Sequence, residues 1–236
     1  MTTDWFAGPI AMRYDASTGP YFEPANIEAT VGFLADLAGG GSALELGIGT
    51  GRIALPLAAR RVRVQGIDLS PDMVAQLRRK PGGDAIPVEI GDYATTRVDG
   101  LFSLVYVVFN SINNQTTQDA QVATFENAAR HLEPGGCFVV EVGVPNTRAL
   151  EVFDVSDTHV GVDELDLATQ RLVSHHFTLA DGRWERLSVP FRSVSPAELD
   201  LMARIAGMRL RERWSGWNRE PFTSESAKHV SVWEKA

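Results

Sequence analysis

Three acidic residues lie where they could bind the polar groups of a ligand. Glu45 stands two residues before a glycine-rich run, and Asp68 and Asp92 each follow a further apolar segment. A carboxylate accepts hydrogen bonds from ribose hydroxyls or an exocyclic amine, and it attracts ammonium and sulfonium groups. The three acids therefore predict a site for a nucleoside-containing ligand that carries positive charge.

The glycine-rich run discriminates between two kinds of nucleotide ligand. It has the pattern Gly-x-Gly-x-Gly, with glycines at Gly47, Gly49 and Gly51, whereas a dinucleotide fingerprint would have its third glycine where Arg52 stands. Glu45 would also repel a pyrophosphate. A nicotinamide-dependent reductase remains an alternative, because such enzymes also use an acid at the position of Asp68 to bind ribose.

Alternating strands and helices position these residues. The patterns predict helices at 24–37, 52–60, 70–77 and 117–131, and strands at 42–46, 62–67, 86–90, 101–109 and 138–144. This order predicts right-handed crossovers and a doubly wound parallel sheet. Ligands bind such a sheet beyond the carboxyl ends of its strands, where all three acids are expected.

The last third of the chain is rich in strand-like segments. Residues 165–191 suggest a hairpin around Asp181-Gly182, a helix follows at 195–207, and two antiparallel strands near 208–214 and 229–234 end the chain. We predict one α/β domain over residues 1–236 with a Rossmann-like, doubly wound, mostly parallel seven-stranded sheet and antiparallel C-terminal strands. Two segments are added to this sheet. They are an N-terminal arm (1–25) and a β-rich insertion (146–195) over the active site, and the insertion forms a small β-hairpin after strand five.

Four segments resemble the successive motifs of class I S-adenosylmethionine-dependent methyltransferases, namely 45–51, 68–70, 91–92 and 132–136. The resemblance covers about residues 30–145. It implies S-adenosyl-L-methionine as cofactor and S-adenosyl-L-homocysteine as product. It also implies that Glu45 and the glycines hold the methionine moiety, Asp68 the ribose and Asp92 the adenine.

The N-terminal arm and the insertion extend the resemblance to a bacterial small-molecule subgroup that includes aminosugar N-methyltransferases. Tyr14, Asp15 and Tyr21 carry it in the arm. The two tyrosines could equally be aromatic residues that pack the arm onto the body. The candidate cofactor-binding residues are Tyr14, Tyr21, Glu45, Gly47, Gly49, Gly51, Arg52, Asp68, Leu69, Met73, Asp92, Tyr93 and Phe109.

Methyl transfer from a sulfonium mainly requires an aligned nucleophile and the exclusion of water. An amine acceptor must arrive unprotonated, and a hydroxyl acceptor needs a base more urgently. The candidate catalytic residues are Asn110, His175 and Tyr14. Asn110 follows the fourth strand, next to the expected methyl group, and His175 and His176 must face opposite sides of one strand, so that one of them at most reaches a site.

Composition restricts the partners. The net charge of −8 argues against a nucleic-acid partner, so we expect a small-molecule acceptor, with an amine or hydroxyl to be methylated. The longest apolar runs are too short to span a membrane and no signal segment is recognisable, which predicts a cytoplasmic protein, as monomer or homodimer. The single cysteine excludes a cysteine-rich zinc site, and no metal is expected. A non-catalytic partner subunit that binds the cofactor remains a further alternative.

Overall fold

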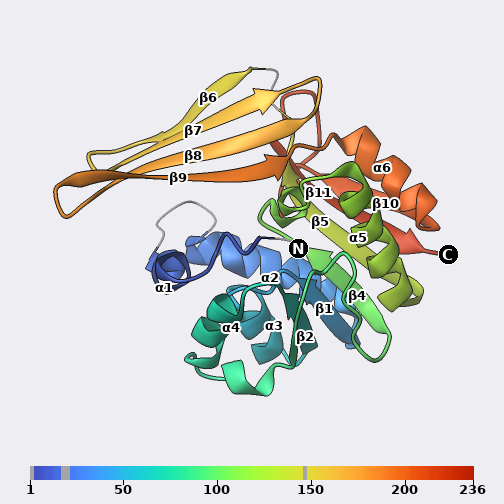
Figure 1. Cartoon of the computed structure of the whole chain (residues 1–236). Helices are drawn as coiled ribbons and strands as arrows, with labels where there is room; N and C mark the ends of the chain where they lie inside the picture. The colour runs from blue at the N-terminus through green and yellow to red at the C-terminus, as the bar shows by residue number, and fades with distance from the viewer. Residues whose placement is uncertain (1–2, 17–21, 146–147) are drawn as a thin grey trace.

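The computed structural model describes residues 3–16, 22–145 and 148–236, which form a seven-stranded sheet and a separate four-stranded sheet (Figure 1). The strands of the larger sheet, in spatial order, are β10 (Met208–Trp214), β11 (Lys228–Lys235), β5 (Leu132–Gly143), β4 (Phe102–Val107), β1 (Ser42–Leu46), β2 (Arg63–Asp68) and β3 (Val88–Ile90). The helices are α1 (Pro9–Arg13), α2 (Pro24–Ala38), α3 (Ala54–Ala59), α4 (Pro71–Arg78), α5 (Gln118–His131) and α6 (Pro196–Ile205).

The strand pairing confirms the predicted doubly wound sheet. Strands β1 to β5, the first five along the chain, pair in parallel. Strand β11 runs antiparallel to both of its neighbours, β5 and β10. The order reverses between β1 and β4, so the carboxyl ends of these two strands border the crevice in which such sheets bind ligands. In the described part of the chain, no helix combines the length and the apolar character that a membrane crossing requires.

Two apolar cores, one on each face, hold the helices to the sheet. The helices α2 and α3 pack on one face through residues such as Leu34 and Leu57, and α5 and α6 pack on the other through residues such as Phe125 and Met202. Side chains of β4 alternate between the two cores. Both faces of β4 are therefore covered, which explains its unbroken apolar sequence.

Strand β5 begins earlier than predicted. Phe102 pairs with Leu132 and Leu104 with Cys137, so residues 133–136 form a bulge within the pairing. Gly135 has a φ of 78° there, a conformation that glycine adopts without steric cost. The Pro-Gly-Gly segment, which was predicted to separate the helix from the strand, thus lies inside the strand.

The insertion is larger than the predicted hairpin. It is an antiparallel sheet of β6 (Leu150–Val155), β7 (His159–Asp166), β8 (Arg171–Ala180) and β9 (Arg183–Arg192), and it projects away from the main sheet above α1 (Figure 1). The turn between β8 and β9 does lie at Asp181-Gly182, where both φ angles are positive, as in the tight hairpin turns that match strand twist. The prediction missed β6 and β7, whose side chains are largely exposed or half-buried and do not alternate clearly.

A polar cluster around Arg192 joins the base of the insertion to the helices. Its guanidinium donates to Gln121 of α5 and, at 2.7 Å, to Glu198 Oε1 of α6. The exposed fractions of these two ion-paired side chains are 7% for Arg192 and 15% for Glu198. Removing one partner of such a pair leaves the other charge buried without compensation.

The variant Arg192→Met tests this anchor. We expect it to lower the free energy of unfolding by about 3 kcal/mol, because Glu198 loses its buried partner. The control is Arg209→Met, which breaks an ion pair with Glu234 at a side chain that is 75% exposed, and it should cost less than about 0.5 kcal/mol. Urea unfolding measures both, and equal losses would contradict the assignment.

Candidate active site

The turn after β1 brings backbone groups to the edge of the sheet. Gly47 and Gly49 have φ angles of 77° and 53°, in the left-handed region, and the Gly47 amide donates to the Ile67 carbonyl oxygen at 2.8 Å. A Cβ atom on Gly49 would lie 3.2 Å from the terminal methyl of Met73. The turn is therefore fixed and requires glycine, and it leaves room for a ligand to approach the backbone.

Asp68 links this turn to the end of β2. Its Oδ2 accepts a hydrogen bond from the Gly49 amide at 2.6 Å, and its Oδ1 accepts one from the Ser70 amide at 2.8 Å. Burial raises the pKa of this carboxyl, and the two amide bonds oppose that rise. Leu69 is half-buried beside it, while Met73 is buried against the turn.

Glu45 lies beneath the same turn and is only 3% exposed. Its Oε2 accepts a hydrogen bond from the Tyr106 hydroxyl at 2.9 Å. Burial raises the pKa of Glu45 to about 8, although the Tyr106 bond and the charge of Arg52 oppose the rise. A carboxyl group in this state becomes charged most readily when a cation binds beside it.

Aromatic rings and Arg52 border the other side of the turn. The Arg52 guanidinium lies 4.8 Å from the centroid of the Phe109 ring and 5.2 Å from that of Phe22. Edge-to-face contacts continue from Phe22 to Tyr14 and from Tyr14 to Phe6. Burial raises the pKa of Tyr14 to about 12, so its phenol is neutral at physiological pH.

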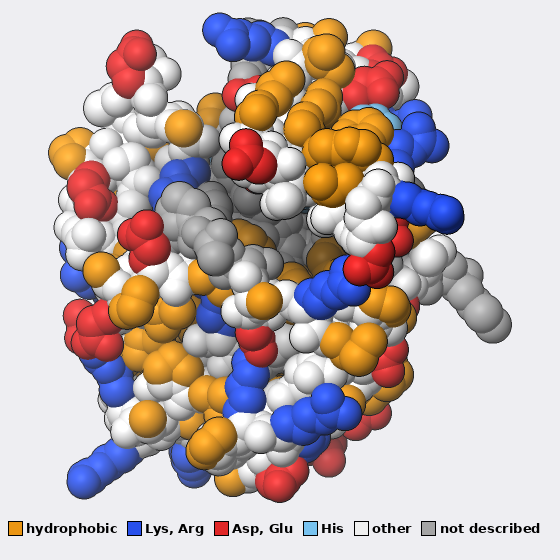
Figure 2. All heavy atoms as spheres, turned by 90° about the vertical axis from the view of Figure 1, so that its left-hand side faces the viewer, with side chains coloured by type: hydrophobic (Ala, Val, Ile, Leu, Met, Phe, Trp, Pro, Cys, Tyr) orange, Lys and Arg blue, Asp and Glu red, His pale blue; other side chains and the backbone are white. Residues whose placement is uncertain are grey.

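Two cavities meet at these rings. A small one lies against the glycine turn and is lined by Glu45, Gly47, Gly49 and Arg52, among others. A large one, of about 820 Å³, lies between the insertion and the main sheet, where the surface is hollowed (Figure 2). Both cavities are lined by Tyr14, Phe109 and Ser111.

The segment after β4 is strained where the cavities meet. Phe109 and Asn110 have φ angles of 59° and 58°, which are unfavourable for residues other than glycine. Strand β5 holds this conformation, because the Phe109 amide donates to Glu141 Oε2 at 3.1 Å and Asn110 Oδ1 accepts from the Gly143 amide at 2.7 Å. Such strain persists where the surrounding structure enforces it, commonly at functional sites.

The N-terminal arm is fastened to the glycine turn by polar contacts. Asp15 accepts a hydrogen bond from the Thr50 hydroxyl at 2.6 Å and pairs with the Lys80 ammonium at 2.6 Å. Lys80 also donates to the Thr50 carbonyl oxygen at 2.7 Å. The clamp of Asp15, Thr50 and Lys80 thus positions Tyr14 over the small cavity.

Seven of the fifteen sequence-predicted residues line these cavities, and among the others Tyr93 and His175 have contacts elsewhere. The seven are Tyr14, Glu45, Gly47, Gly49, Arg52, Phe109 and Asn110. Tyr93 is buried in the core, where its hydroxyl donates to the Ser111 carbonyl oxygen, so it supports the segment after β4 and is not placed to cover an adenine. His175 bonds to Ser188 and Glu164 on the outer face of the insertion, whereas His176 lines the large cavity. The predicted catalytic role of His175 is therefore corrected.

Asp92 and Gly51 lie at the expected edge of the sheet. Asp92 follows β3, and its Oδ1 accepts hydrogen bonds from the Ala94 amide at 2.9 Å and from Gln115 Nε2 at 2.8 Å. Gly51, with a φ of 77°, ends the glycine turn. Tyr21 lies outside the described residues.

The sequence analysis missed several residues of the large cavity. They are Phe6, Phe22, Arg148, Glu151, Phe153, Asp154, Asp163 and Ser174. Residues 172, 174 and 176 share one face of β8, an alternation that is readable in the sequence once the strand is known.

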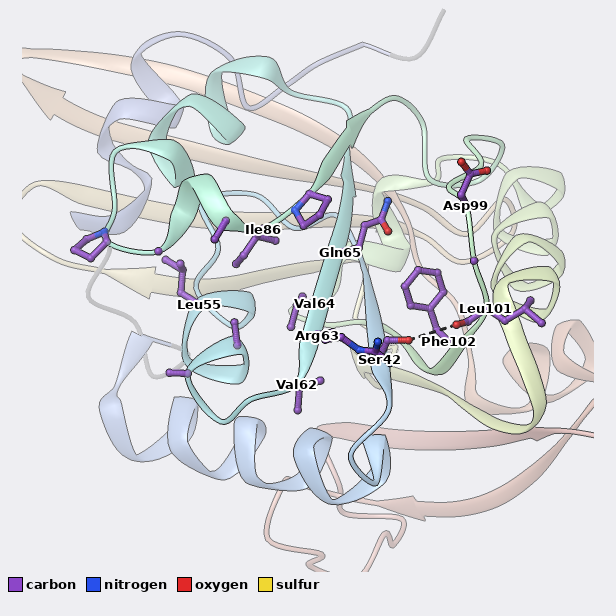
Figure 3. Close-up of a pocket in the computed structure, with 17 residues that line it drawn as sticks. Ser42, Leu55, Val62, Arg63, Val64, Gln65, Ile86, Asp99, Leu101 and Phe102 are labelled. Atoms are coloured by element: carbon purple, nitrogen blue, oxygen red, sulfur yellow. Dashed lines mark hydrogen bonds between the residues drawn. The ribbon is translucent and has the colours of Figure 1, made fainter.

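A third cavity, of about 780 Å³, lies at the other end of the parallel strands, where they begin (Figure 3). Its lining includes Ser42, Arg63 and Phe102, which begin β1, β2 and β4. Ligands of doubly wound sheets bind at the carboxyl ends of the strands, so this cavity is not the active site.

Comparisons with known proteins identify the family. A model described as a methyltransferase domain matches residues 43–136, which span β1 to the start of β5. The structure of the CcbJ methyltransferase from Streptomyces caelestis is 34% identical in sequence and superposes with a TM-score of 0.88 over 96% of each chain. The chain belongs to the class I S-adenosylmethionine-dependent methyltransferases. The prediction from the sequence motifs is thus confirmed, and the nicotinamide-dependent reductase is excluded.

Two curated relatives of the methyltransferase are similar over much of their length. The cypemycin N-terminal methyltransferase of a Streptomyces species is 26% identical over 205 residues, which are 83% of this chain and 84% of the relative. The dTDP-3-amino-3,4,6-trideoxy-alpha-D-glucopyranose N,N-dimethyltransferase of Streptomyces venezuelae is 29% identical over 160 residues, or 66% and 63% of the two chains.

The arm clamp is tested by Lys80→Met. Losing the contacts of Lys80 to Asp15 and Thr50 should speed hydrogen–deuterium exchange in residues 9–16 about three-fold, as expected for a partly exposed ion pair. The neighbouring variant Arg79→Met, which removes a contact to Gln76 within α4 and its C-terminal end, serves as the control. Unchanged exchange in Lys80→Met would show that packing alone holds the arm.

Proposed function

We propose that this methyltransferase transfers a methyl group from S-adenosylmethionine to an amine nitrogen of a small molecule in the large cavity. The observation that carries the proposal is the shared lining of the two cavities by Tyr14, Phe109 and Ser111. A donor in the glycine-lined cavity and an acceptor beneath the insertion would meet at these three residues. The methyl group would then cross between them without passing through bulk water.

The residues of the small cavity fit the donor. Glu45 would bind the ammonium of its methionine moiety, Arg52 the carboxylate, and the backbone of Gly47–Gly51 would lie against the chain between them. Farther along the sheet edge, Asp68 with Leu69 would bind the ribose. Asp92 and Met73 would hold the adenine. When bound, S-adenosylmethionine supplies an electrophilic methyl group on a sulfonium that leaves readily.

The protein's own residues align the acceptor and exclude water. The rings of Tyr14, Phe22 and Phe109 form an apolar wall whose faces attract a cationic or partly charged amine. Asn110 lines the large cavity beside them and would orient the acceptor. Alignment and desolvation account for most of the acceleration that a displacement of this kind needs.

Several observations favour an amine over a hydroxyl acceptor. The pKa of Tyr14 is about 12, so at neutral pH the phenol does not supply the base that a hydroxyl acceptor would need. The names of both curated relatives describe methylation of nitrogen, on a peptide N-terminus and on an aminosugar nucleotide. The net charge of −8 supports a small, neutral or cationic partner rather than a nucleic acid. The composition supports a cytoplasmic location.

An acceptor panel tests the proposal. The purified enzyme is incubated with S-adenosylmethionine and dTDP-3-amino-3,4,6-trideoxyglucose, a peptide with a free N-terminal amine, or simple amines, each paired with its hydroxyl analogue. We expect mass spectrometry to show a methyl gain on at least one amine and on none of the analogues. Methylation of hydroxyls alone, or of no acceptor, would contradict the proposal.

The buried Glu45 predicts a pH-dependent affinity for the cofactor. Below its pKa of about 8 the group is protonated in the free protein, and binding an ammonium requires the carboxylate. Binding should therefore release a proton, and affinity should rise about ten-fold per pH unit up to about pH 8 and then level off.

Calorimetry with S-adenosylhomocysteine in buffers of different ionisation enthalpy measures the proton release. In Glu45→Gln the affinity should fall by about 1–3 kcal/mol and lose its pH dependence. The exposed Glu89→Gln serves as the control and should match the wild type. A pH slope that survives in Glu45→Gln would assign the linkage to another group.

A further inference from the structure

Two stacked histidines stand on the cavity face of the insertion. The rings of His159 and His176 are 5.3 Å apart between centroids and inclined by 30°. His159 Nδ1 lies 2.6 Å from Asp154 Oδ2, and His159 Nε2 lies 3.1 Å from His176 Nδ1. The three side chains thus form a continuous hydrogen-bonded series from β6 across β7 to β8.

The Asp154 carboxylate determines which ring nitrogen donates in each hydrogen bond of this series. Asp154 can only accept, so the proton of a neutral His159 lies on Nδ1, and its Nε2 must then accept from His176 Nδ1–H. His176 is left with an unprotonated Nε2. This is the arrangement in which a carboxylate orients a histidine as a base.

The unprotonated nitrogen of His176 belongs to a side chain that lines the acceptor cavity, where it lies next to Ser174. His176 and Ser174 line the same cavity as Tyr14, Phe109 and Asn110, and the Ser174 hydroxyl lies 3.3 Å from His176 Nε2. Ser174 also hydrogen-bonds the Asp163 carboxyl. Its single hydroxyl proton can point to only one of them at a time, toward His176 when that ring is neutral and toward Asp163 when it is protonated.

Burial is the main reason why His176 stays neutral near physiological pH. Burial, His159 and the neighbouring His175 lower the pKa of His176, and Asp154 opposes them. On the same cavity face, β7 contributes Asp163, β6 contributes Glu151, and Arg148 and Tyr14 line the cavity beyond them. From β9, the residue opposite His176 is Leu187, which does not titrate.

We propose that His176 is the base that accepts the proton of the acceptor's ammonium group, with His159 and Asp154 as positioning residues that orient its ring and stabilise its charge. This inference rests on the proposed function, because it requires an amine acceptor. Amines are largely protonated at neutral pH and cannot attack a methyl group in that form. An amine that enters the cavity as an ammonium must therefore give up a proton before it can be methylated.

The transfer is balanced at each step. An N–H bond of the ammonium breaks as one forms at His176 Nε2, which frees the nitrogen lone pair for methylation. His176 then carries a proton on both ring nitrogens, and the hydrogen bonds through His159 to Asp154 stabilise its positive charge. His176 Nε2 returns the proton to water once the product has left the cavity.

A pair of adjacent histidines provides the matched experiment. His176→Gln removes the base. His175→Gln alters the preceding residue, whose side chain points to the outer face. With the amine that the wild type methylates fastest, we expect kcat of His176→Gln at neutral pH to fall about 100-fold. The loss should shrink at high pH, where the amine is already neutral, and His175→Gln should behave as the wild type.

The pH profile separates a base from a structural or binding residue. Wild-type kcat should fall as the pH drops through the lowered pKa of His176. In Asp154→Asn this limb should move to lower pH by about one unit, because the ring loses carboxylate stabilisation through His159. An unchanged profile in His176→Gln, a rise in KM alone, or an equal loss in His175→Gln would overturn the proposal.

The direction of the series is tested without turnover. In the ¹⁵N-histidine-labelled enzyme with S-adenosylhomocysteine, long-range ¹H–¹⁵N spectra should show neutral His159 and His176, both protonated at Nδ1. Protonation of neutral His176 at Nε2 would overturn the inference. This result is independent of the acceptor panel. Failure of the proposed role of His176 and failure of the proposed function are therefore distinguishable.

Discussion

The burial of the Glu45 carboxyl under the glycine turn is the constraint on which the donor side of the active site depends. A buried acid is costly unless hydrogen bonds or opposite charge compensate it. Tyr106 supplies a hydrogen bond from β4, and Arg52 supplies charge from the segment after the turn. The main sheet brings these groups together because β1 lies beside β4 at the reversal of strand order. In the proposed function a cationic ligand would complete the compensation, which would link cofactor affinity to the protonation state of Glu45.

In the proposed reaction, the two sheets bind different substrates. The main sheet provides the acidic, glycine-lined small cavity for the donor, and the insertion provides half of the residues that line the large cavity for the acceptor. Between them lie the N-terminal arm and the strained Phe109 and Asn110, which β5 holds in place. In the part of the chain that the structure describes, no group of three or more His, Cys, Asp or Glu side chains is arranged to bind a metal ion.

The sequence locates the ends of the parallel strands far better than the residues that line the cavity beneath the insertion, for a physical reason. Gly47, Glu45 and Asp68 act through local geometry at the ends of strands, and apolar periodicity locates those ends. The cavity beneath the insertion depends on which residues of β6–β9 share a face. One residue of register decides between His175 and His176. The clamp between Asp15 and Lys80 joins residues that are distant in sequence, and no local pattern marks such a contact.

Because of the way the insertion is attached, the shape of the acceptor pocket and the stability of the main domain can change independently. Among the described residues, none of β6–β9 belongs to either apolar core of the main domain. The sheet is instead joined to the helices at its base through Arg192. Substitutions on its inner face can therefore reshape the pocket while the folding energy of the body stays nearly constant. Such an architecture lets acceptor preference diverge between homologues at little cost in the free energy of folding, while the residues of the main sheet stay unchanged.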